Sequence, residues 1–204
     1  MTFNWQLLTK YMTKSNDQAI IQAASSVFMK HGYRRSNMSL ISKQAGFSRV
    51  TIHKYLKNKD DAFRKCINQI LIDSRTACEP VLNASRNGQP CWSTIESIID
   101  LWITPTFEDA EDHLILQELK YFAQQMTEDL FNDAHTTLED MLLEVITRGI
   151  ENKEISLDKL NISELQLVKL IVASISGIRA KVEIKDIAPF NHEMLGVFKV
   201  ATEI

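Results

Sequence analysis

Residues 48–59 concentrate side chains that can donate hydrogen bonds to phosphate oxygens or to the edges of bases. The segment SRVTIHKYLKNK holds cationic, hydroxyl, phenol and imidazole groups within about three helical turns. Arg49 can bind guanine O6 and N7 or a phosphate, and Val50 and Thr51 can contact a thymine methyl group. For any one of them alone, the alternative is an exposed helix residue that contacts only solvent. Their grouping favours recognition of nucleic acid.

Two short helices around a tight turn would present this segment. Ser42 is small enough to let two helices cross closely, and Gly46 can adopt the positive φ of the turn. The spacing predicts a helix-turn-helix with helices over 37–45 and 49–56, the second facing outward. Apolar residues stand at the positions that bury one helix against the other, namely Ile41, Ala45, Phe47, Ile52 and Tyr55.

Further candidate contacts extend this outward face. We expect the hydroxyls of Ser36 and Ser48 to cap helices and also to donate to phosphate, since the two roles do not exclude each other. Lys59 would begin the next helix, where a cation opposes the helix dipole unless a phosphate lies beside it. The candidate DNA-binding residues are Ser36, Lys43, Ser48, Arg49, Val50, Thr51, His53, Lys54, Tyr55 and Lys59.

The net charge of the 204-residue chain, −3, hides a strong asymmetry. Residues 1–70 hold 12 Lys and Arg against 3 Asp and Glu, a net charge of +9. Residues 71–204 hold 11 against 23, a net charge of −12. A basic head joined to an acidic body is typical of a nucleic-acid-binding module attached to a domain that does not bind nucleic acid. The alternative is chance clustering of charges on a solvated surface.

Helical periodicity continues through the rest of the chain, in which Gly and Pro are scarce. We expect an all-α fold of about nine helices. Gly32 should end the first confident helix, and Pro80 should bend or end the fourth. Outside the motif, the pattern predicts helices over 16–31, 59–83, 91–104, 107–126, 128–152 and 161–183, and a last helix that Pro189 opens.

Several classes of protein and of site find no support in the sequence. No apolar stretch is long enough to span a bilayer, and the N-terminus does not resemble a signal peptide. Cys66, Cys78 and Cys91 form no CxxC pair, so we expect no disulfide framework, no zinc site and a location in the reducing cytoplasm. His135 and Glu139 have the spacing of two metal ligands, but such a pair is more often simply solvated. Because no nucleophile with its base and no Gly-rich phosphate loop is evident, we expect neither an enzyme nor a cofactor.

Aromatic and sulfur-containing side chains gather in the first half of the acidic body. They can line an apolar pocket for a small effector, with a few polar anchors. The alternative, which is favoured for any one of them, is ordinary core packing. The candidate pocket residues are Trp92, Trp102, Phe107, His113, Gln117, Tyr121, Phe122, Met126, Phe131 and His135.

The last two predicted helices carry more apolar surface than one core face needs. Pairing with the same helices of a second subunit, as a four-helix bundle, would bury that surface. The alternative is burial within one subunit, because a helix that is apolar all round can simply be central. The candidate interface residues are Leu165, Val168, Val172, Ile175, Phe190, Met194, Val197 and Phe198.

Residues 17–63 resemble the TetR family of bacterial transcriptional regulators over three helices and the start of a fourth. The chain departs from the family habit at Val50, where Gly is common, and at His53, where Tyr is usual. The resemblance implies a homodimer whose third helices enter successive major grooves of a pseudo-palindromic operator. It also implies a helical domain that dimerises and binds an effector. The matching residues are Ala23, Ala24, Phe28, Gly32, Ile41, Ala45, Gly46, Ser48, Thr51, Tyr55 and Lys59.

These observations together favour a sequence-specific transcriptional regulator, and most simply a repressor that a small molecule controls. Its expected partners are a double-stranded DNA operator, a second copy of the chain and a small-molecule effector, with no membrane. We expect an arm and DNA-binding domain over 1–58 and an effector-binding and dimerisation domain over 59–204. The alternative is an activator, or a module that binds DNA or protein without sequence specificity and without an effector.

Overall fold

The computed structural model describes residues 15–103 and 112–204 of the chain. Within these ranges all regular structure is α-helical, in nine helices labelled α2 to α10, which confirms the predicted all-α class. The chain divides into two compact units. The first comprises Met1–Gln69 and Asp109–Thr127, and the second comprises Ile70–Glu108 and Glu128–Ile204. The predicted arm over residues 1–14 lies outside the described residues.

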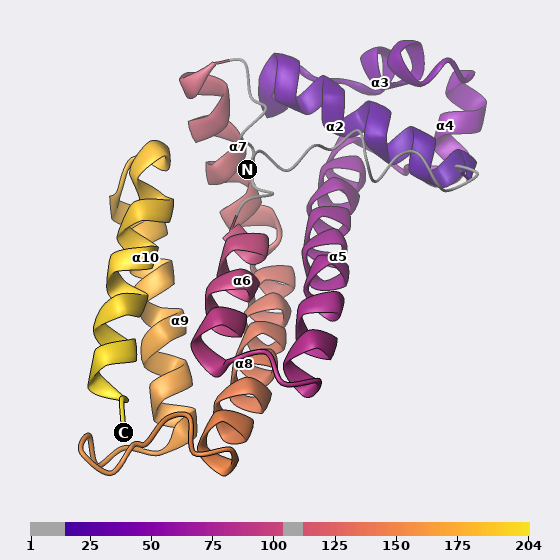
Figure 1. Ribbon diagram of the computed structural model, residues 1–204. Helices are drawn as coiled ribbons and strands as arrows, with labels where there is room; N and C mark the ends of the chain where they lie inside the picture. The colour runs from indigo at the N-terminus through magenta and orange to yellow at the C-terminus, as the bar shows by residue number, and fades with distance from the viewer. Residues whose placement is uncertain (1–14, 104–111) are drawn as a thin grey trace. The chain divides into compact units, whose positions relative to one another are not determined.

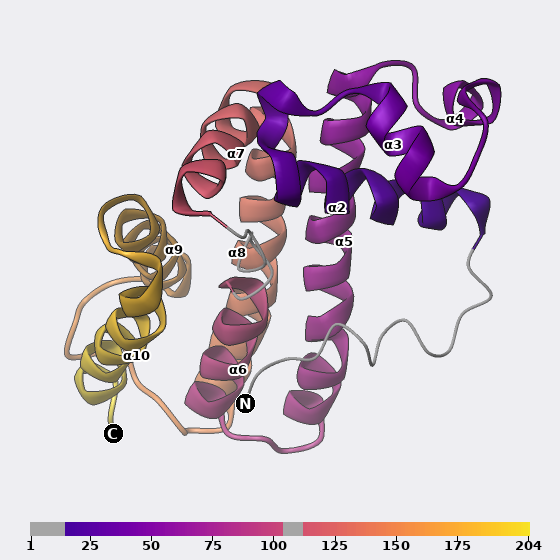
Figure 2. The same cartoon turned by 90° about the horizontal axis from the view of Figure 1, so that it is seen from above.

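The first unit is built on α2 (Asn16–Arg35), against which α3 (Met38–Ala45), α4 (Arg49–Tyr55) and α7 (His113–Met126) pack. It also holds the first residues of α5 (Lys59–Arg86). The short helices α3 and α4 and the separate α7 all lie beside α2 (Figures 1 and 2). The boundaries of α3 and α4 agree with the predicted motif to within one residue.

A side-chain cap precedes each of the first four helices. Ser15, Asn37, Ser48 and Asn58 accept backbone N–H bonds at the starts of α2, α3, α4 and α5. Each such cap satisfies donors that have no partner inside the helix, and it stabilises the helix by about 1 kcal/mol. Asn37 caps α3, so the prediction that Ser36 is a helix cap was wrong.

Two glycines of the first unit adopt positive φ. Gly46 ends α3 in the left-handed conformation, with φ 71° and ψ 15°, as the predicted turn requires. Gly32 has φ 74° and ψ 170°, but the helical chain resumes after it and runs to Arg35. Gly32 therefore kinks α2 rather than ending it, which corrects the sequence-based expectation.

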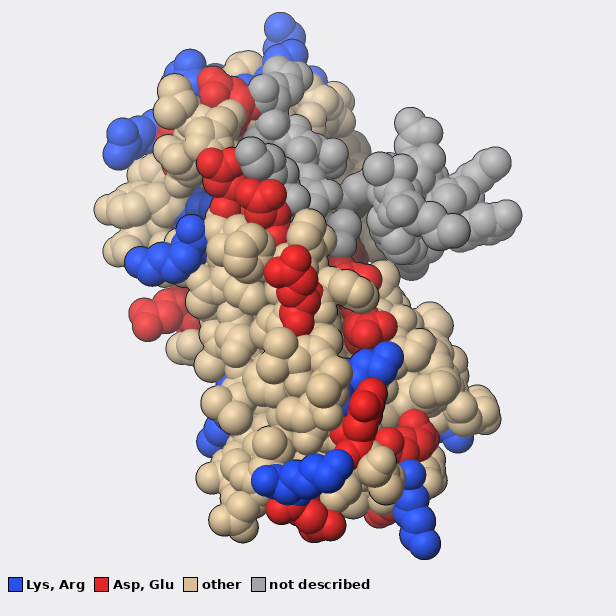
Figure 3. All heavy atoms as spheres, turned by 60° about the vertical axis from the view of Figure 1, so that its left-hand side comes forward, with Lys and Arg blue, Asp and Glu red and all other residues tan. Residues whose placement is uncertain are grey.

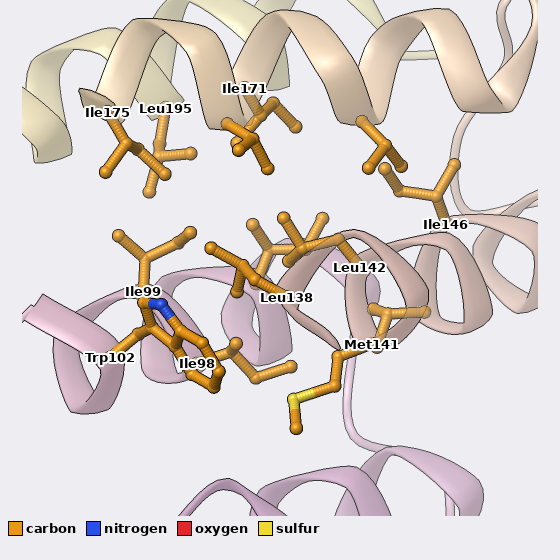
Figure 4. Close-up of a cluster of buried hydrophobic side chains, with 14 of the residues drawn as sticks. Ile98, Ile99, Trp102, Leu138, Met141, Leu142, Ile146, Ile171, Ile175 and Leu195 are labelled. Atoms are coloured by element: carbon orange, nitrogen blue, oxygen red, sulfur yellow. The ribbon is translucent and has the colours of Figure 1, made fainter. Parts of the chain in front are cut away.

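The second unit holds the rest of α5 together with α6 (Cys91–Ile103), α8 (Glu128–Glu151), α9 (Glu164–Lys181) and α10 (Ile184–Ala201). α8 packs against α6 and α9, and α10 packs against α6 and α9. Buried side chains from these helices point toward one another in Figure 4. Removal of this apolar surface from water is the main force that holds the unit together. The labelled core residues are Ile98, Ile99, Trp102, Leu138, Met141, Leu142, Ile146, Ile171, Ile175 and Leu195.

Two prolines lie inside helices rather than at their ends. α5 continues past Pro80 to Arg86, and α10 begins at Ile184, before Pro189. The prediction that Pro189 opens a helix was therefore wrong, and of the two outcomes expected at Pro80, a bend or an end, the end is excluded. A proline inside a helix removes one backbone hydrogen bond. Each of these helices nevertheless buries apolar residues close to its proline, Leu82 in α5 and Ile187 in α10. Among the described residues, no helix is long and apolar enough to cross a membrane.

Candidate nucleic-acid interface

α4 buries one narrow face and exposes the rest. Ile52 is fully buried, and Leu56 closes the helix as a buried cap residue. In the preceding turn the Ser42 hydroxyl donates to the Phe47 carbonyl at 2.6 Å, a bond that ties α3 to the segment leading into α4. The small polar residue at this crossing therefore also fixes the turn. As predicted, the opposite side of α4 faces outward.

The first residues of α4 hold one another in place. The Arg49 guanidinium donates to the Ser39 hydroxyl on α3. The Ser48 hydroxyl accepts the Thr51 N–H at 3.1 Å and lies 3.0 Å from the Thr51 hydroxyl. These contacts fix the side chains of Arg49 and Thr51 against the protein itself. Between them, Val50 is 73% exposed.

Cations surround this exposed face. His53 and Lys54 of α4 are exposed, as are Lys43 of α3 and Lys57 of the following loop. In the described part of the chain, no ion pair involves Lys43, Lys54 or Lys57. Unpaired cations next to an exposed helix are the arrangement that binds a phosphate backbone.

Lys59 has partners inside the first unit. It is the first residue of α5, as expected, and its ammonium donates to the Tyr33 carbonyl at 3.2 Å. The ammonium also lies 4.2 Å from the centre of the Tyr33 ring. The Tyr33 hydroxyl donates to Asp60 at 2.5 Å, and burial together with this carboxylate raises the pKa of Tyr33 above its usual range. These contacts give Lys59 a structural role, and its contact with phosphate stays a prediction.

Ser36 and Tyr55 lie further from the outward face than the sequence suggests. Ser36 is buried, and its hydroxyl donates to the Gly32 carbonyl at 2.5 Å. It is therefore withdrawn from the candidate DNA contacts. Tyr55 is half-buried, and its backbone carbonyl accepts a hydrogen bond from Lys65.

The structure places α7 in the first unit, a position that sequence reasoning missed. A carboxylate oxygen of Glu118 accepts the Arg34 N–H at 2.6 Å, just after the Gly32 kink. The ring centres of Tyr33 and Phe122 lie 4.2 Å apart, and the Arg34 guanidinium carbon lies 5.6 Å from the centre of the Phe122 ring. The two partners of the Glu118 bond are 84 residues apart, and no local sequence signal reports such a contact.

The candidate pocket residues fall into both units. Those on α7 belong to the first unit, whereas Trp92, Trp102, Phe131 and His135 belong to the second. Both tryptophans are buried in the core of the second unit, and the Trp92 indole N–H donates to the Thr202 hydroxyl at 3.0 Å. Phe107 lies outside the described residues. The α7 members are His113, Gln117, Tyr121, Phe122 and Met126.

Two hollows are described in the second unit, and none of the candidate pocket residues lines either of them. One, of about 500 Å³, lies along the connection between α8 and α9 and is lined by residues such as Leu157, Ile162 and Ile204. The other, of about 310 Å³, lies between α5 and α8 and is lined mostly by charged side chains. The assignment of the effector pocket therefore stays a prediction.

The candidate interface residues divide between core and surface. Val168, Val172 and Ile175 are buried in the core of the second unit, so for them the alternative of burial within one subunit holds. Met194 and Phe198 are partly buried against the same core. The exposed members are Leu165, Phe190 and Val197, and further exposed apolar side chains that sequence reasoning missed are Leu170, Val200 and Ile204.

The cysteines of the described residues are not activated as nucleophiles. Cys66, Cys78 and Cys91 are free and buried, and burial raises the pKa of each thiol to about 12. These thiols are therefore protonated at neutral pH and are poor nucleophiles. No group of three or more His, Cys, Asp or Glu side chains in this part of the chain is placed to hold a metal ion.

Comparison with known proteins identifies the N-terminal segment. Residues 20–66 match the sequence profile of the family described as bacterial regulatory proteins, tetR family. A Bacillus subtilis (strain 168) protein named uncharacterized HTH-type transcriptional regulator YfiR is 26% identical over 114 residues. The matched segment is 56% of this chain and 53% of that protein, so it spans about half the length of the relative.

Solved structures resemble nearly the whole chain. SmeT, the repressor of the Stenotrophomonas maltophilia multidrug efflux pump SmeDEF, has a TM-score of 0.64 at 16% identity, over 94% of this chain and 92% of that chain. A second SmeT structure is a complex with triclosan. FadR from Bacillus subtilis, in complex with stearoyl-CoA, has a TM-score of 0.61 at 19% identity, over 90% of this chain and 97% of that chain. At these identities the likeness shows a shared fold. The profile match and the helix-turn-helix of α3 and α4 show that residues 20–66 carry the DNA-binding segment typical of bacterial regulatory proteins of the tetR family.

Proposed function

We propose that the protein is a transcriptional repressor that binds a specific double-stranded DNA site as a homodimer and is released by a small effector. The observation that carries this proposal is the outward face of α4. Its exposed side chains belong to residues 1–70, whose net charge is +9. Such a helix enters the major groove, and the surrounding cations contact phosphates on both sides. A DNA target also places the protein in the cytoplasm.

The proposed contacts to DNA come from α3, α4 and the start of α5. The exposed cations fix the position of the head on the phosphate backbone, and the side chains at the front of α4 read base edges. Ser36 is left out because its side chain is buried. The proposed contact residues are Lys43, Ser48, Arg49, Val50, Thr51, His53, Lys54, Tyr55 and Lys59.

An exposed apolar stripe on α10 supports the homodimer. Phe190, Val197 and Val200 follow one another at helical spacing, and they are 48%, 69% and 68% exposed. Leu170 on α9 is also exposed, and beside it the small residues Ala173 and Gly177 would allow a second helix to approach closely. A homodimer with its two-fold axis at these helices would bury the stripe, and its two DNA-binding heads would bind the two half-sites.

Control by an effector is proposed from the relatives and from the position of α7. SmeT has been solved with triclosan and FadR with stearoyl-CoA, and both ligands carry large apolar parts. In this chain α7 packs on the kink of α2 in the first unit, while its sequence neighbours α6 and α8 belong to the second unit. A ligand that displaces α7 would therefore disturb the head. We propose that this displacement lowers the affinity for DNA.

Selection from a randomised duplex library, followed by binding titrations with the selected duplex, tests the proposal. The full-length protein should recover a pseudo-palindromic motif and bind it about 1,000-fold more tightly than unrelated sequence. Lys54→Ala should weaken binding to both duplexes and reduce the salt slope by about 1, because it removes one phosphate contact. Lys181→Ala, at an exposed cation of α9, is the matched control. Recovery of no motif, with equal binding to all sequences, would favour a module that lacks sequence specificity.

A further inference from the structure

The front of α4 exposes an apolar side chain that has no role inside the protein. Val50 is the second residue of the helix and is 73% exposed, the same fraction as Ile204 near the end of the chain. Its isopropyl group adds nothing to the buried core of the first unit. Single exposed apolar side chains are common on protein surfaces, so Val50 is singled out by its place between Arg49 and Thr51 on the proposed DNA-binding face.

The residues on both sides of Val50 each make a side-chain contact within the protein. The Arg49 guanidinium donates to the Ser39 hydroxyl of α3. The Thr51 hydroxyl lies 3.0 Å from the Ser48 hydroxyl, which also caps the helix. Of the three residues at the start of α4, Val50 is the one whose side chain is apolar and makes no hydrogen bond.

The major groove displays an apolar group at only one kind of base. Guanine offers two acceptors, cytosine a donor and adenine an acceptor and a donor, whereas thymine adds its C5-methyl group to a carbonyl acceptor. A valine cannot donate or accept a hydrogen bond, so it can discriminate only through this methyl group. We infer that Val50 reads the C5-methyl group of a thymine in each half-site. The base at this position is then chosen by an apolar contact rather than by Arg49 binding guanine.

The charge around Val50 favours DNA over a protein partner. Lys43 and Lys54 are exposed, and neither has an ion pair in the described part of the chain. A single valine within a cationic surface offers too little apolar area for a protein interface. Phosphates flanking a major groove match the same surface in charge and in spacing. The inference rests on the proposed function, since it presupposes binding to a defined DNA site.

Replacing thymine by deoxyuridine tests the contact directly. This change removes the C5-methyl group and leaves every hydrogen-bonding group of the base in place. The full-length protein is first used to select a duplex from a randomised library, and each thymine of that duplex is then replaced in turn. Binding is measured by fluorescence anisotropy at one fixed salt concentration. We expect about fourfold weaker binding at one thymine position in each half-site, the loss typical of one buried methyl group.

The variant Val50→Ala tests whether Val50 is the residue that contacts the thymine methyl group. The variant homodimer loses the contact at both half-sites, so it should bind the thymine duplex at least about 15-fold more weakly than the wild type, roughly the square of the loss at one half-site. At the sensitive position, deoxyuridine should then change its affinity by less than about twofold, because the two partners of one contact are coupled. The exposed site should tolerate the change, and circular dichroism checks the fold. Ile72→Ala, at another exposed apolar residue, should keep the wild-type response to deoxyuridine.

Three results would overturn the inference, and they separate it from the proposed function. A selected motif whose affinity does not respond to deoxyuridine at any thymine removes the methyl contact but leaves sequence-specific binding intact. An equal loss in the wild type and in Val50→Ala assigns the methyl contact to another residue. Failure to recover any motif, with equal binding to all duplexes, contradicts the proposed function itself.

Discussion

At Gly32 a carboxylate of α7 lies so close to the backbone of α2 that an added side chain would push it aside. A Cβ atom at this position would lie 3.0 Å from Oε2 of Glu118. The backbone, with φ 74° and ψ 170°, is also in a region that other residues rarely enter. Beside it, the Glu118 carboxylate accepts the Arg34 N–H. Gly32 therefore serves both the kink of α2 and the contact of that helix with α7.

We expect Gly32→Ala to lower the free energy of unfolding by about 1–3 kcal/mol, through backbone strain and displacement of Glu118. Urea unfolding followed by circular dichroism measures the change. Gly196→Ala is the matched control, because this helical glycine of α10 has negative φ and no atom within 4 Å of an added Cβ. The control should gain about 0.5–1 kcal/mol, since alanine favours a helix. A similar gain in Gly32→Ala would contradict the assigned role.

At the scale of elements, an ion cluster bridges α5 and α8 in the second unit. The Arg86 guanidinium donates to both carboxylate oxygens of Glu144, at 2.8 and 2.9 Å. One turn further along α8, Arg148 donates to the same carboxylate at 2.7 Å and to the Ser85 hydroxyl at 2.9 Å. These hydrogen bonds hold the pKa of Glu144 below its usual value of 4.5, and the one from Arg86 has the largest effect. The cluster therefore ties the end of α5 to α8.

The lowered pKa of Glu144 predicts a dependence of stability on pH. Its folded-state pKa lies below the unfolded value, so the bridge contributes stability above about pH 4.5 and loses it as pH falls through the folded-state pKa. Glu144→Gln should be less stable than the wild type near pH 7, and the difference should narrow toward about pH 3. Urea unfolding at several pH values provides the measurement. Glu139→Gln, at another α8 carboxylate, controls for charge. A constant difference at all pH values would show that the bridge contributes nothing through ionisation.

At the scale of the whole molecule, the two proposed macromolecular partners would use different surfaces, a basic one for DNA and an apolar one for a second copy of the chain. The first 70 residues carry a net charge of +9, whereas the rest of the chain carries −12. On the face drawn in Figure 3, Asp and Glu side chains are interspersed with Lys and Arg rather than joined in one acidic sheet. Such a mixed surface is typical of solvated protein. In the second unit, the exposed valines of α10, Val197 and Val200, are apolar surface that the proposed second copy would cover.

We expect the wild type to have twice the mass of one chain in light scattering at micromolar concentration. Val197→Arg should shift the mass toward that of one chain, because a two-fold axis would place the new charge beside its own copy. Ile72→Arg, at an exposed apolar residue of α5, should leave the mass unchanged. A wild-type mass of one chain would count against the proposed homodimer, and so would an unchanged mass in Val197→Arg.

The sequence by itself determined the local features of the head. The cap at Ser48, the left-handed Gly46 and the buried Ile52 depend on residues within one or two turns, so their spacing was sufficient. The same holds for the helical class of the rest of the chain, which follows from apolar periodicity. For these features, the physical causes lie within a few residues of their effects.

Only the tertiary structure decided which apolar or polar face meets which neighbour. Periodicity placed Val168 and Val197 in one candidate interface, yet the first is buried in the core and the second is exposed. The sequence predicts Ser36 as a surface donor, whereas the fold buries it, and the contact of Glu118 with Arg34 joins residues 84 positions apart. Spacing along a helix fixes which residues share a face. What covers that face depends on the packing of distant segments, which local sequence does not encode.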